Sequence, residues 1–410
     1  RLLNAGLRRA RVPVDSLGRP IGRPAYIGRG APPRALQVTV DADLQRAAER
    51  AIRDGIRFAH SAGHADANAG AAVVMDARTG AIRALASHPS FSQVAAARNP
   101  RYLARLLRGD GPPLVERATQ GVFPLGSTFK PIVAQAALAA GLISPWSVLQ
   151  CTGSLPVGNH VFHNVEPGVN APLTLRSALS TSCDTWFYRL GVMFDARRVR
   201  SGNLDMQRWA RLLGLGTATG VDLPGEATGV IPTPGWLRRT FTIPWQRVWF
   251  TGYSVNLSIG QGQLAVTPLQ LAVAYAALAN GGTVVRPHVG GRILSSSGDV
   301  VRRLRFPPRR HVRLPSLWAI HQGLYDAAHT GTSAAIFGDF PIPVAGKTGT
   351  AETGTGSDHS WYASWAPAGN PRVVVVVLIE HGGFGAEAAA PAAREIYEAY
   401  FRLGRRARRG

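Results

Sequence analysis

Two lysines stand out in a chain that otherwise carries its positive charge on arginine. Of the 46 basic residues, 44 are arginine and the other two are Lys130 and Lys347. A guanidinium stays protonated in any protein site, whereas a desolvated lysine amine can lose its proton and act as a base. An amine kept at only two positions therefore indicates a chemical role, unless both lysines are surface residues placed by chance. The residues around each lysine decide between these alternatives.

Ser127 lies three residues before Lys130 and in front of an apolar run, 132–140, that ends at Gly141. This pattern predicts a helix closed by a glycine cap. Residues three apart share a helix face, so the hydroxyl and the amine would be neighbours. The first turn of a helix also favours a developing oxyanion, because its free N–H groups and its dipole are positive there. This is the arrangement of a serine nucleophile with a lysine base.

Three short motifs stand in a fixed order along the chain. They are Ser127-x-x-Lys130, Ser182-x-Asp184 and Lys347-Thr348-Gly349-Thr350. Each motif alone occurs by chance in many chains of this length. In this order, and with both lysines of the protein included, they form a specific signature.

The rest of the chain supplies strands that could carry these motifs. Alternating apolar residues and turn residues predict a strand over 37–40, a hairpin over 71–87 and three successive strands over 344–352, 360–366 and 372–380. The order of elements indicates that the hairpin and the last three strands share one antiparallel sheet. The prediction is an α/β (α+β) fold in which helices surround a sheet formed by both ends of the chain.

Helices are expected after Ser127 and in four other segments: after Asp41, over 174–190, over 268–278 and over 388–403. The second motif falls inside the expected 174–190 helix. The 268–278 helix is apolar nearly all round, so it must be buried at the centre of a helical layer.

Composition bounds the possible partners. With 410 residues, 45% of them hydrophobic, the chain can bury a large core in one domain or two. A net charge of +22 suits anionic lipid headgroups or wall polymer, or reflects an arginine-favouring composition with no specific partner. No nucleic-acid partner is expected, because the sequence has no zinc-finger spacing, no ribonucleoprotein motif and no basic region leading into heptads. No segment reaches the length of a membrane span.

Residues 1–36 differ from the rest of the chain. They are rich in Arg, Pro and Gly with little periodicity, which predicts a linker or the remnant of another domain. Because the chain opens at Arg1 without Met or a signal sequence, we expect a fragment from which a leader or membrane anchor has been removed. The other end of the chain is a basic tail, 405–409.

The three motifs together resemble the signature of the penicillin-recognising serine acyltransferases. The resemblance covers roughly 37–403 and includes four further segments, Gln37-Val38-Thr39-Val40-Asp41, Met75-Asp76-Ala77-Arg78-Thr79-Gly80, Ser258 to Gly262 and Val266-Thr267-Pro268-Leu269-Gln270. The chain looks most like the transpeptidase domain of a class B penicillin-binding protein. Within that class it is most similar to penicillin-binding protein 2 of the cell-elongation machinery, on the segment Cys183-Asp184-Thr185-Trp186-Phe187-Tyr188.

This resemblance implies the fold and the domain boundaries. We expect the penicillin-binding/serine β-lactamase-like transpeptidase fold, with an antiparallel sheet flanked by helices and a further helical layer. Residues 37–410 would form the penicillin-binding transpeptidase domain. Residues 1–36 would be a linker or the remnant of the non-catalytic pedestal domain.

The resemblance also implies a peptidoglycan D,D-transpeptidase and assigns catalytic roles. Ser127 would attack the penultimate D-Ala carbonyl of a stem peptide, and Lys130 would take its proton. Ser182 would relay a proton to the leaving D-Ala amine. Backbone N–H groups of Ser127 and Thr350 would form the oxyanion hole.

The third motif would bind the substrate. Lys347 and the hydroxyls of Thr348 and Thr350 would hold the terminal carboxylate, and Gly349 lacks a side chain where the strand must accept substrate backbone. Strand alternation places Lys347 and Gly349 on one face and both threonines on the other, so a twist or bulge is expected if both hydroxyls are to face the site. Asp184 would also contact the substrate. It departs from the family pattern, because most relatives have an Asn there whose amide holds a substrate carbonyl.

Two other functions compete with this one. A serine β-lactamase or D,D-carboxypeptidase would need a positioned base for deacylation, and carboxylates between the second and third motifs, such as Glu226, have no recognisable context. A non-catalytic penicillin sensor or wall-binding scaffold is the other alternative, and the intact serine and both lysines argue against it. Ser182 and Asp184 could also be simple helix caps.

The two cysteines, Cys151 and Cys183, are too few for a disulfide scaffold and say nothing about the compartment. Cys183 is predicted to be a packed thiol. Cys151, His160, His163 and Cys183 could hold zinc, but their spacing fits no standard finger, so no metal and no cofactor are predicted.

The resemblance implies partners and a location. Substrates would be peptidoglycan stem peptides ending in D-Ala-D-Ala, and β-lactams would be inhibitors. A membrane glycosyltransferase of the elongation complex would work with the domain. The domain would lie on the extracytoplasmic side of the cell membrane, held by an anchor that this chain lacks.

Overall fold

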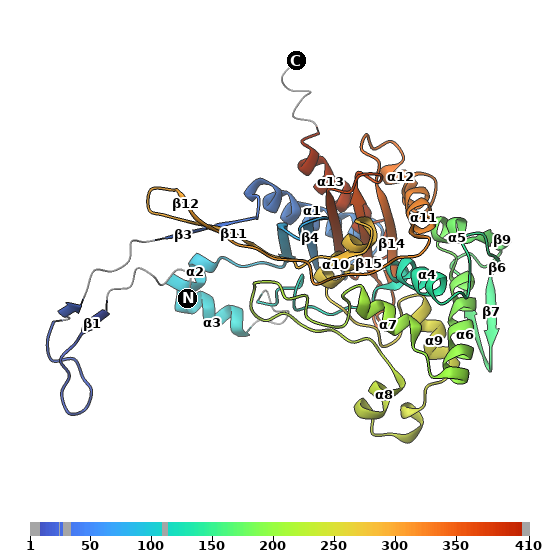
Figure 1. Cartoon of the computed structure of the whole chain (residues 1–410), viewed down its shortest axis with the longest axis horizontal. Helices are drawn as coiled ribbons and strands as arrows, with labels where there is room; N and C mark the ends of the chain where they lie inside the picture. The colour runs from blue at the N-terminus through green and yellow to red at the C-terminus, as the bar shows by residue number, and fades with distance from the viewer. Residues whose placement is uncertain (1–8, 24, 28–33, 109–113, 404–410) are drawn as a thin grey trace, which may run out of the picture.

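One antiparallel sheet organises the domain (Figure 1). The computed structural model describes residues 9–23, 25–27, 34–108 and 114–403. The sheet has five strands, in the order β14 (Ala345–Ala351), β15 (His359–Ala366), β16 (Val373–Glu380), β4 (Ala69–Asp76) and β5 (Ile82–His88). Because β16 pairs with β4, with Val375 opposite Val74, the C-terminal strands extend the N-terminal hairpin. The predicted sheet, built from both ends of the chain, is confirmed.

The central strand β16 has a core on each of its faces. Residues 373–379 are all buried, and the even-numbered ones belong to one apolar cluster while the odd-numbered ones belong to another. Successive side chains alternate across a strand, so a continuous apolar run requires cover on both sides. Helices α1 (Ala42–Ser61) and α13 (Ala389–Phe401) cover the odd-numbered face, and α10 (Pro268–Ala279) covers the other (Figure 1).

The predicted helices α1 and α10 are confirmed with their caps. Asp41 caps α1 by accepting hydrogen bonds from the N–H groups of Asp43 and Leu44. Thr267 caps α10, and every residue of α10 is buried. A helix that is apolar all round is thus enclosed between the sheet and the next layer.

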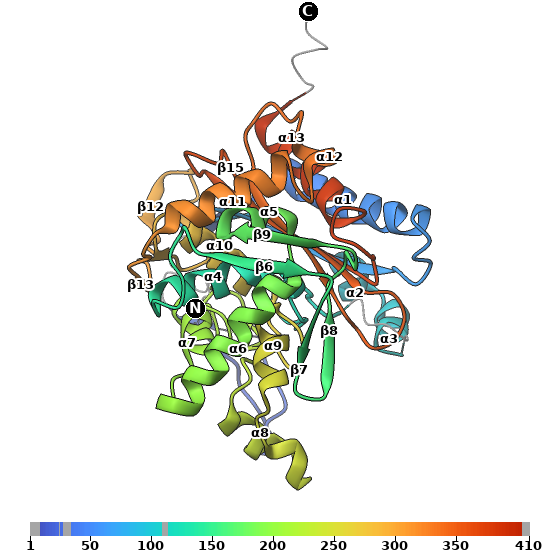
Figure 2. The same ribbon diagram turned by 90° about the vertical axis from the view of Figure 1, so that its right-hand side faces the viewer.

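A helical layer beyond α10 carries the first two motifs (Figure 2). It contains α4 (Lys130–Ala139), α5 (Leu175–Thr181), α6 (Asp184–Ser201), α7 (Asp205–Leu212), α9 (Thr251–Ser258) and α11 (Leu317–His329). The expected single helix over 174–190 is wrong, because the chain breaks between α5 and α6. Ser182 has a φ of 61°, in the left-handed region, and this ends one helix and redirects the chain into the next.

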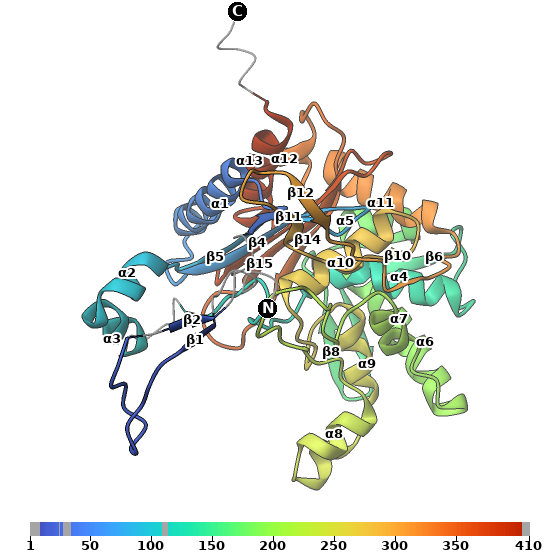
Figure 3. The same cartoon turned by 60° about the vertical axis from the view of Figure 1, so that its left-hand side comes forward.

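Small ribbons and short helices lie at the periphery (Figures 2 and 3). They are β1 (Arg9–Arg11), β2 (Ala25–Ile27), β3 (Ala35–Val38), β6 (Val148–Thr152), β7 (Ser154–Val157), β8 (His160–His163), β9 (Asn170–Thr174), β10 (Thr283–Val284), β11 (Gly290–Leu294), β12 (Val300–Arg303), β13 (Arg310–His311), α2 (Gln93–Arg98), α3 (Pro100–Arg108), α8 (Pro234–Thr240), α12 (Ala334–Phe337) and the 3-10 turn η3 (Pro244–Arg247). The other 3-10 turn, η2 (Gly126–Phe129), is mostly buried and lies directly before α4. The pairs β6 with β9 and β7 with β8 lie beside α5 and α6 in Figure 2.

The expected strand over 37–40 corresponds to β3, which ends at Val38. It forms a separate three-stranded sheet with β11 and β12 (Figure 1). The basic tail 405–409 lies outside the described residues. Of the helices in the described ranges, none has the length and apolar character needed to cross a membrane.

Candidate active site

The three motifs meet at one pocket between the edge strand β14 and the helical layer. The pocket has a volume of about 610 Å³. Its lining contains the predicted nucleophile and the polar side chains of the other motifs, namely Ser127, Ser182, Asp184, Thr348 and Thr350. Lys130 and Lys347 have no exposed surface and are buried beneath this lining. The structure thus brings the predicted site residues together.

Ser127 lies in the 3-10 turn η2, directly before α4. The turn is held against neighbouring backbone, because the Gly126 N–H donates to the Gly260 carbonyl (3.0 Å). Gly126 has a φ of +52°, and a Cβ atom there would come 2.2 Å from the Thr350 carbonyl oxygen. Glycine is therefore required where the nucleophile's turn touches β14.

The Lys130 amine makes three hydrogen bonds, all to the second motif. It donates to the Ser182 carbonyl (2.6 Å), the Ser182 hydroxyl (3.1 Å) and an Asp184 carboxylate oxygen (2.7 Å). Burial lowers the pKa of Lys130, and the negative charge of Asp184 opposes that shift. Among the hydrogen bonds of the described residues, none joins this amine to the Ser127 hydroxyl. The Lys130 amine of the first motif is therefore bound by residues of the second motif.

Asp184, the first residue of α6, is held through both its backbone and its side chain. Its N–H donates to the Asn164 side-chain oxygen (2.8 Å), and its carboxylate pairs with Lys130 at 2.7 Å. A carboxylate binds a charged amine more strongly than an amide does. Asn164, in the loop between β8 and β9, was missed by sequence reasoning, because no motif marks it.

Strand β14 keeps an unbroken register with β15, with Lys347 opposite Ala363 and Thr350 opposite Ser360. This pairing contains no bulge, so the bulge considered from the sequence is absent. Thr348 and Thr350 both line the pocket because alternate residues of a strand share a face. The Thr348 hydroxyl donates to a further hydroxyl, of Thr332, at 2.9 Å.

Lys347 is fully buried, and its amine donates to the Thr348 carbonyl at 3.4 Å. Burial holds the pKa of Lys347 well below its usual range. The positive charge of Lys130 lowers the pKa further, and Asp184 opposes both effects. The two lysines singled out from the composition therefore lie close enough for the charge of Lys130 to act on Lys347.

Gly349 packs against the nucleophile's turn. A Cβ atom at this position would come 2.8 Å from the Leu125 carbonyl oxygen and 2.8 Å from the Thr128 Cγ2. This contact is a structural reason for glycine here, and the predicted reason, room for substrate backbone, stays a prediction. β14 is the edge strand of the sheet, so its outer backbone groups can still pair with an added peptide.

Comparison with known proteins assigns the family. Residues 70–398 match the penicillin binding protein transpeptidase domain. The chain belongs to this family. The Haemophilus influenzae peptidoglycan D,D-transpeptidase MrdA is 30% identical over 404 residues, which are 92% of this chain and 57% of that protein. This penicillin-binding transpeptidase chain therefore spans little more than half the length of that relative.

Two solved structures share the fold of this penicillin-binding transpeptidase domain. One comes from a study of polymerization and crosslinking by a peptidoglycan synthase complex, with 31% identity, a TM-score of 0.81, and coverage of 96% of this chain and 67% of that one. The other is the imipenem acyl-enzyme complex of Mycobacterium tuberculosis penicillin-binding protein A, with 29% identity, a TM-score of 0.74, and coverage of 91% and 81%. The predicted class B type and transpeptidase fold are confirmed.

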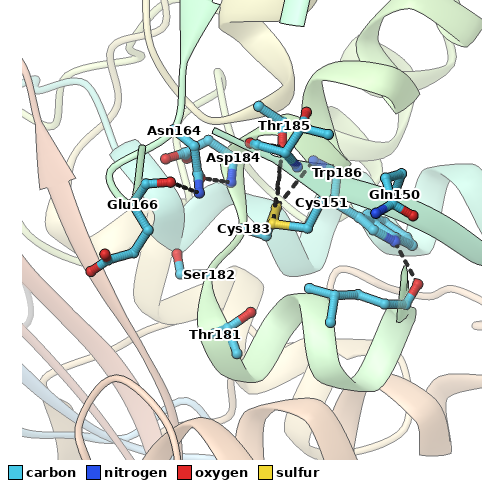
Figure 4. Close-up of a disulfide and its surroundings, with 12 residues drawn as sticks. Gln150, Cys151, Asn164, Glu166, Thr181, Ser182, Cys183, Asp184, Thr185 and Trp186 are labelled. Atoms are coloured by element: carbon cyan, nitrogen blue, oxygen red, sulfur yellow. Dashed lines mark hydrogen bonds between the residues drawn. A yellow bond between two sulfur atoms is a disulfide. The ribbon is translucent and has the colours of Figure 1, made fainter. Parts of the chain in front are cut away.

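The two cysteines of this penicillin-binding transpeptidase form a disulfide (Figure 4). Cys151 of β6 bonds Cys183, the middle residue of the second motif, with their Cα atoms 6.2 Å apart. The prediction of a packed thiol is wrong, and the zinc alternative loses both sulfur ligands because they bond each other. A pair of cysteines 32 residues apart carries no spacing signal that would have revealed this bond.

Three carboxylates in this transpeptidase pocket were not singled out from the sequence. Glu166, Glu352 and Asp358 contribute to the pocket lining. Burial raises the pKa of Glu352, and the nearby negative charges of Asp358 and Asp184 raise it further. The pocket lining therefore carries several acidic side chains in a strongly basic protein.

Proposed function

We propose that this domain is the catalytic part of a peptidoglycan D,D-transpeptidase that cross-links stem peptides during cell-wall elongation and is acylated by β-lactams. The observation that carries the proposal is the single pocket lined by Ser127, Ser182 and Thr350 above two buried lysines. The similarity to a D,D-transpeptidase and to a protein that forms an imipenem acyl-enzyme supports it.

Acylation starts at Ser127. Neutral Lys130 accepts the hydroxyl proton, and the Ser127 Oγ attacks the carbonyl carbon of the penultimate D-Ala. The N–H groups of Ser127 and Thr350 stabilise the oxyanion. Burial supports the role of Lys130, because a lowered pKa makes the neutral amine available nearer to neutral pH. Catalytic contacts often tighten only when substrate binds, so we expect the amine to turn from Ser182 toward Ser127 in the complex.

Ser182 completes the proton transfer. Its hydroxyl lies 3.1 Å from the Lys130 amine. When the C–N bond of the tetrahedral intermediate breaks, Ser182 gives its proton to the departing D-Ala amine and regains one from the Lys130 ammonium. Lys130 is then neutral again. The amine of a second stem peptide attacks the acyl-enzyme by the reverse sequence and forms the cross-link.

The terminal carboxylate of the substrate is assigned to β14. The hydroxyls of Thr348 and Thr350 face the pocket, and Lys347 lies beneath them. A bound carboxylate favours the charged form of a neighbouring lysine. Substrate binding is therefore expected to raise the depressed pKa of Lys347, so that its full charge appears when the ligand is in place.

The position of Glu226 argues against a role for this residue as a hydrolytic base. A hydrolase needs a base aimed at the acyl-enzyme, and Glu226 was the candidate from the sequence. Its carboxylate instead accepts hydrogen bonds from the N–H groups of Thr219 (2.7 Å) and Gly220 (3.1 Å) and so closes a loop.

The domain assignment and the cellular context follow from the same proposal. Residues 37–410 form the transpeptidase domain, and 1–36 are a linker or the remnant of the non-catalytic pedestal domain. In the whole protein, a membrane anchor would hold the domain on the extracytoplasmic side of the membrane beside a glycosyltransferase. The similarity to a chain of a peptidoglycan synthase complex supports this partner.

Penicillin labelling followed by mass spectrometry of the modified peptide tests the proposal. We expect a long-lived adduct on Ser127, none in Ser127→Ala, and slower labelling at Ser127 in Ser182→Ala. An adduct on another residue, or rapid release of the drug, contradicts the proposal. Turnover of a wall-peptide thioester mimic distinguishes an enzyme from a penicillin sensor, which would acylate without turnover.

A further inference from the structure

The disulfide lies at the corner that holds the amine of Lys130. Ser182 and Asp184, which supply all three acceptors for that amine, are the two sequence neighbours of Cys183. Figure 4 shows this corner, with the disulfide reaching across to Cys151 of β6. The covalent bond is therefore one residue away from each group that binds the lysine.

This corner needs support, because its backbone is strained. Ser182 has a φ of 61°, and a non-glycine residue persists in the left-handed region only where its surroundings fix it. The conformation matters, since both the carbonyl and the hydroxyl of Ser182 bind the Lys130 amine. The disulfide supplies support from a different part of the chain.

Hydrogen bonds beside the disulfide join the same two segments. The Thr185 hydroxyl accepts from the Thr152 N–H (2.8 Å) and donates to the Thr152 carbonyl (2.7 Å), next to Cys151. Within the start of α6 itself, the Trp186 N–H points at the sulfur of Cys183 (3.4 Å). The start of α6 is thus fixed to β6 through both covalent and polar contacts (Figure 4).

We propose that Cys151 and Cys183 are positioning residues for acylation, because their disulfide holds Ser182 and Asp184 in place around the Lys130 amine. This inference rests on the proposed function and deepens it. Neither cysteine lines the pocket, whereas the nucleophile Ser127 and the β14 threonines Thr348 and Thr350 do. The cysteines act only through the second motif.

Because the disulfide lies on the side of the second motif, its loss should affect the acylation rate but not the noncovalent affinity for a β-lactam. Without the disulfide, the Kd for noncovalent binding of a β-lactam should stay near that of the wild type, since the carboxylate contacts lie on β14. The acylation rate constant should fall about ten- to a hundredfold, because small displacements of a catalytic group are costly. The acidic limb of the pH profile should move to lower pH, because a looser Asp184 raises the pKa of Lys130 less.

The experiment compares Cys151→Ser, Cys183→Ser and the double variant with the wild type, using stopped-flow acylation by a fluorescent penicillin across pH. Both single variants break the same bond, so we expect equal losses and no further loss in the double variant. Wild-type protein reduced with TCEP under native conditions, with free thiols confirmed by alkylation, should show the same loss. The double variant under TCEP is the control and should not change.

Variants that melt at a lower temperature but acylate with the wild-type rate constant and pH profile would overturn the proposal, because the disulfide would then be a structural brace only. An equal loss of affinity and rate would also overturn it, since that indicates a generally loosened pocket. If the variants do not fold, the acylation rate and pH profile of the reduced wild type test the proposal instead. Failure of the proposed function is distinguishable, because the oxidised wild type itself would then not be acylated on Ser127.

Discussion

The Asp184 carboxylate lies 2.7 Å from the amine of Lys130, a side chain with no exposed surface. This ion pair connects the second motif to the proposed base of the first. Burial lowers the pKa of Lys130 and the charge of Asp184 opposes that shift, so the residue at position 184 contributes to the pH at which the amine becomes neutral. An Asn in this place would bind the amine without carrying that charge.

We expect Asp184→Asn to move the acidic limb of the acylation pH profile to lower pH. The substitution removes the charge that raises the pKa of Lys130, while the burial that lowers it remains. Acylation rates with one β-lactam across pH provide the measurement. Glu352→Gln is the matched control, because it neutralises another carboxylate of the pocket that is not the lysine's partner. An acidic limb that stays in place in Asp184→Asn would mean that Lys130 is not the titrating base.

Gly349→Ala tests the contact between β14 and the nucleophile's turn. The new Cβ would lie 2.8 Å from both the Leu125 carbonyl oxygen and the Thr128 Cγ2, so the strand or the turn must shift. We expect the free energy of unfolding to fall by about 1–3 kcal/mol and acylation of Ser127 to slow. Gly369→Ala is the control, because no atom lies within 4 Å of its Cβ position. Equal denaturant midpoints and acylation rates in the two variants would refute this role.

Lys347→Met should stabilise the fold while weakening ligand binding. Lys347 is fully buried, and burial and the charge of Lys130 depress its pKa. We expect the free energy of unfolding to rise by roughly 1–2 kcal/mol, and the affinity for carboxylate-bearing β-lactams to fall. Lys130→Met is the matched control and should be less stable than the wild type, since it leaves the Asp184 carboxylate without its cation.

The stabilisation by Lys347→Met should depend on pH. The folded state holds the Lys347 proton less tightly than the unfolded state, whose pKa is about 10.4. The buried charge of Lys347 therefore lowers the free energy of unfolding of the wild type by its full amount at pH values below the folded-state pKa. This destabilisation shrinks as the pH rises and disappears above the unfolded-state pKa. Chemical denaturation at neutral and at strongly alkaline pH measures this difference. A stability gain that stays constant between them would contradict a depressed pKa.

The sheet and the buried helix could be predicted because their patterns are local. The apolar run of β16 and the all-round apolar α10 each require burial whatever their neighbours are. The break between α5 and α6 could not be predicted, because the pattern over 174–190 continues through it. The left-handed conformation of Ser182 is associated with contacts to Lys130 and a neighbouring disulfide, which come from distant parts of the chain.

The residues of the candidate site could be predicted from three motifs, but their contacts could not. Nothing in the sequence shows that the Lys130 amine binds the second motif, or that Gly349 faces the turn of Ser127. The bond between Cys151 and Cys183 was missed for the same reason. Each of these contacts joins segments that the fold alone brings together.

Lys130→Arg is expected to abolish acylation as completely as Lys130→Ala, although it keeps the positive charge. A guanidinium cannot be deprotonated in a protein site, so the variant loses the base. If the charge alone were needed, to stabilise the Ser127 alkoxide or the oxyanion, the Arg variant would keep a rate within about tenfold of the wild type, or roughly 1.4 kcal/mol of barrier. Second-order acylation rates of all three proteins across pH provide the measurement, and noncovalent β-lactam affinity shows whether the bulkier side chain leaves the pocket formed. An Arg variant that binds and acylates within tenfold of the wild type would mean that the amine of Lys130 is not the base.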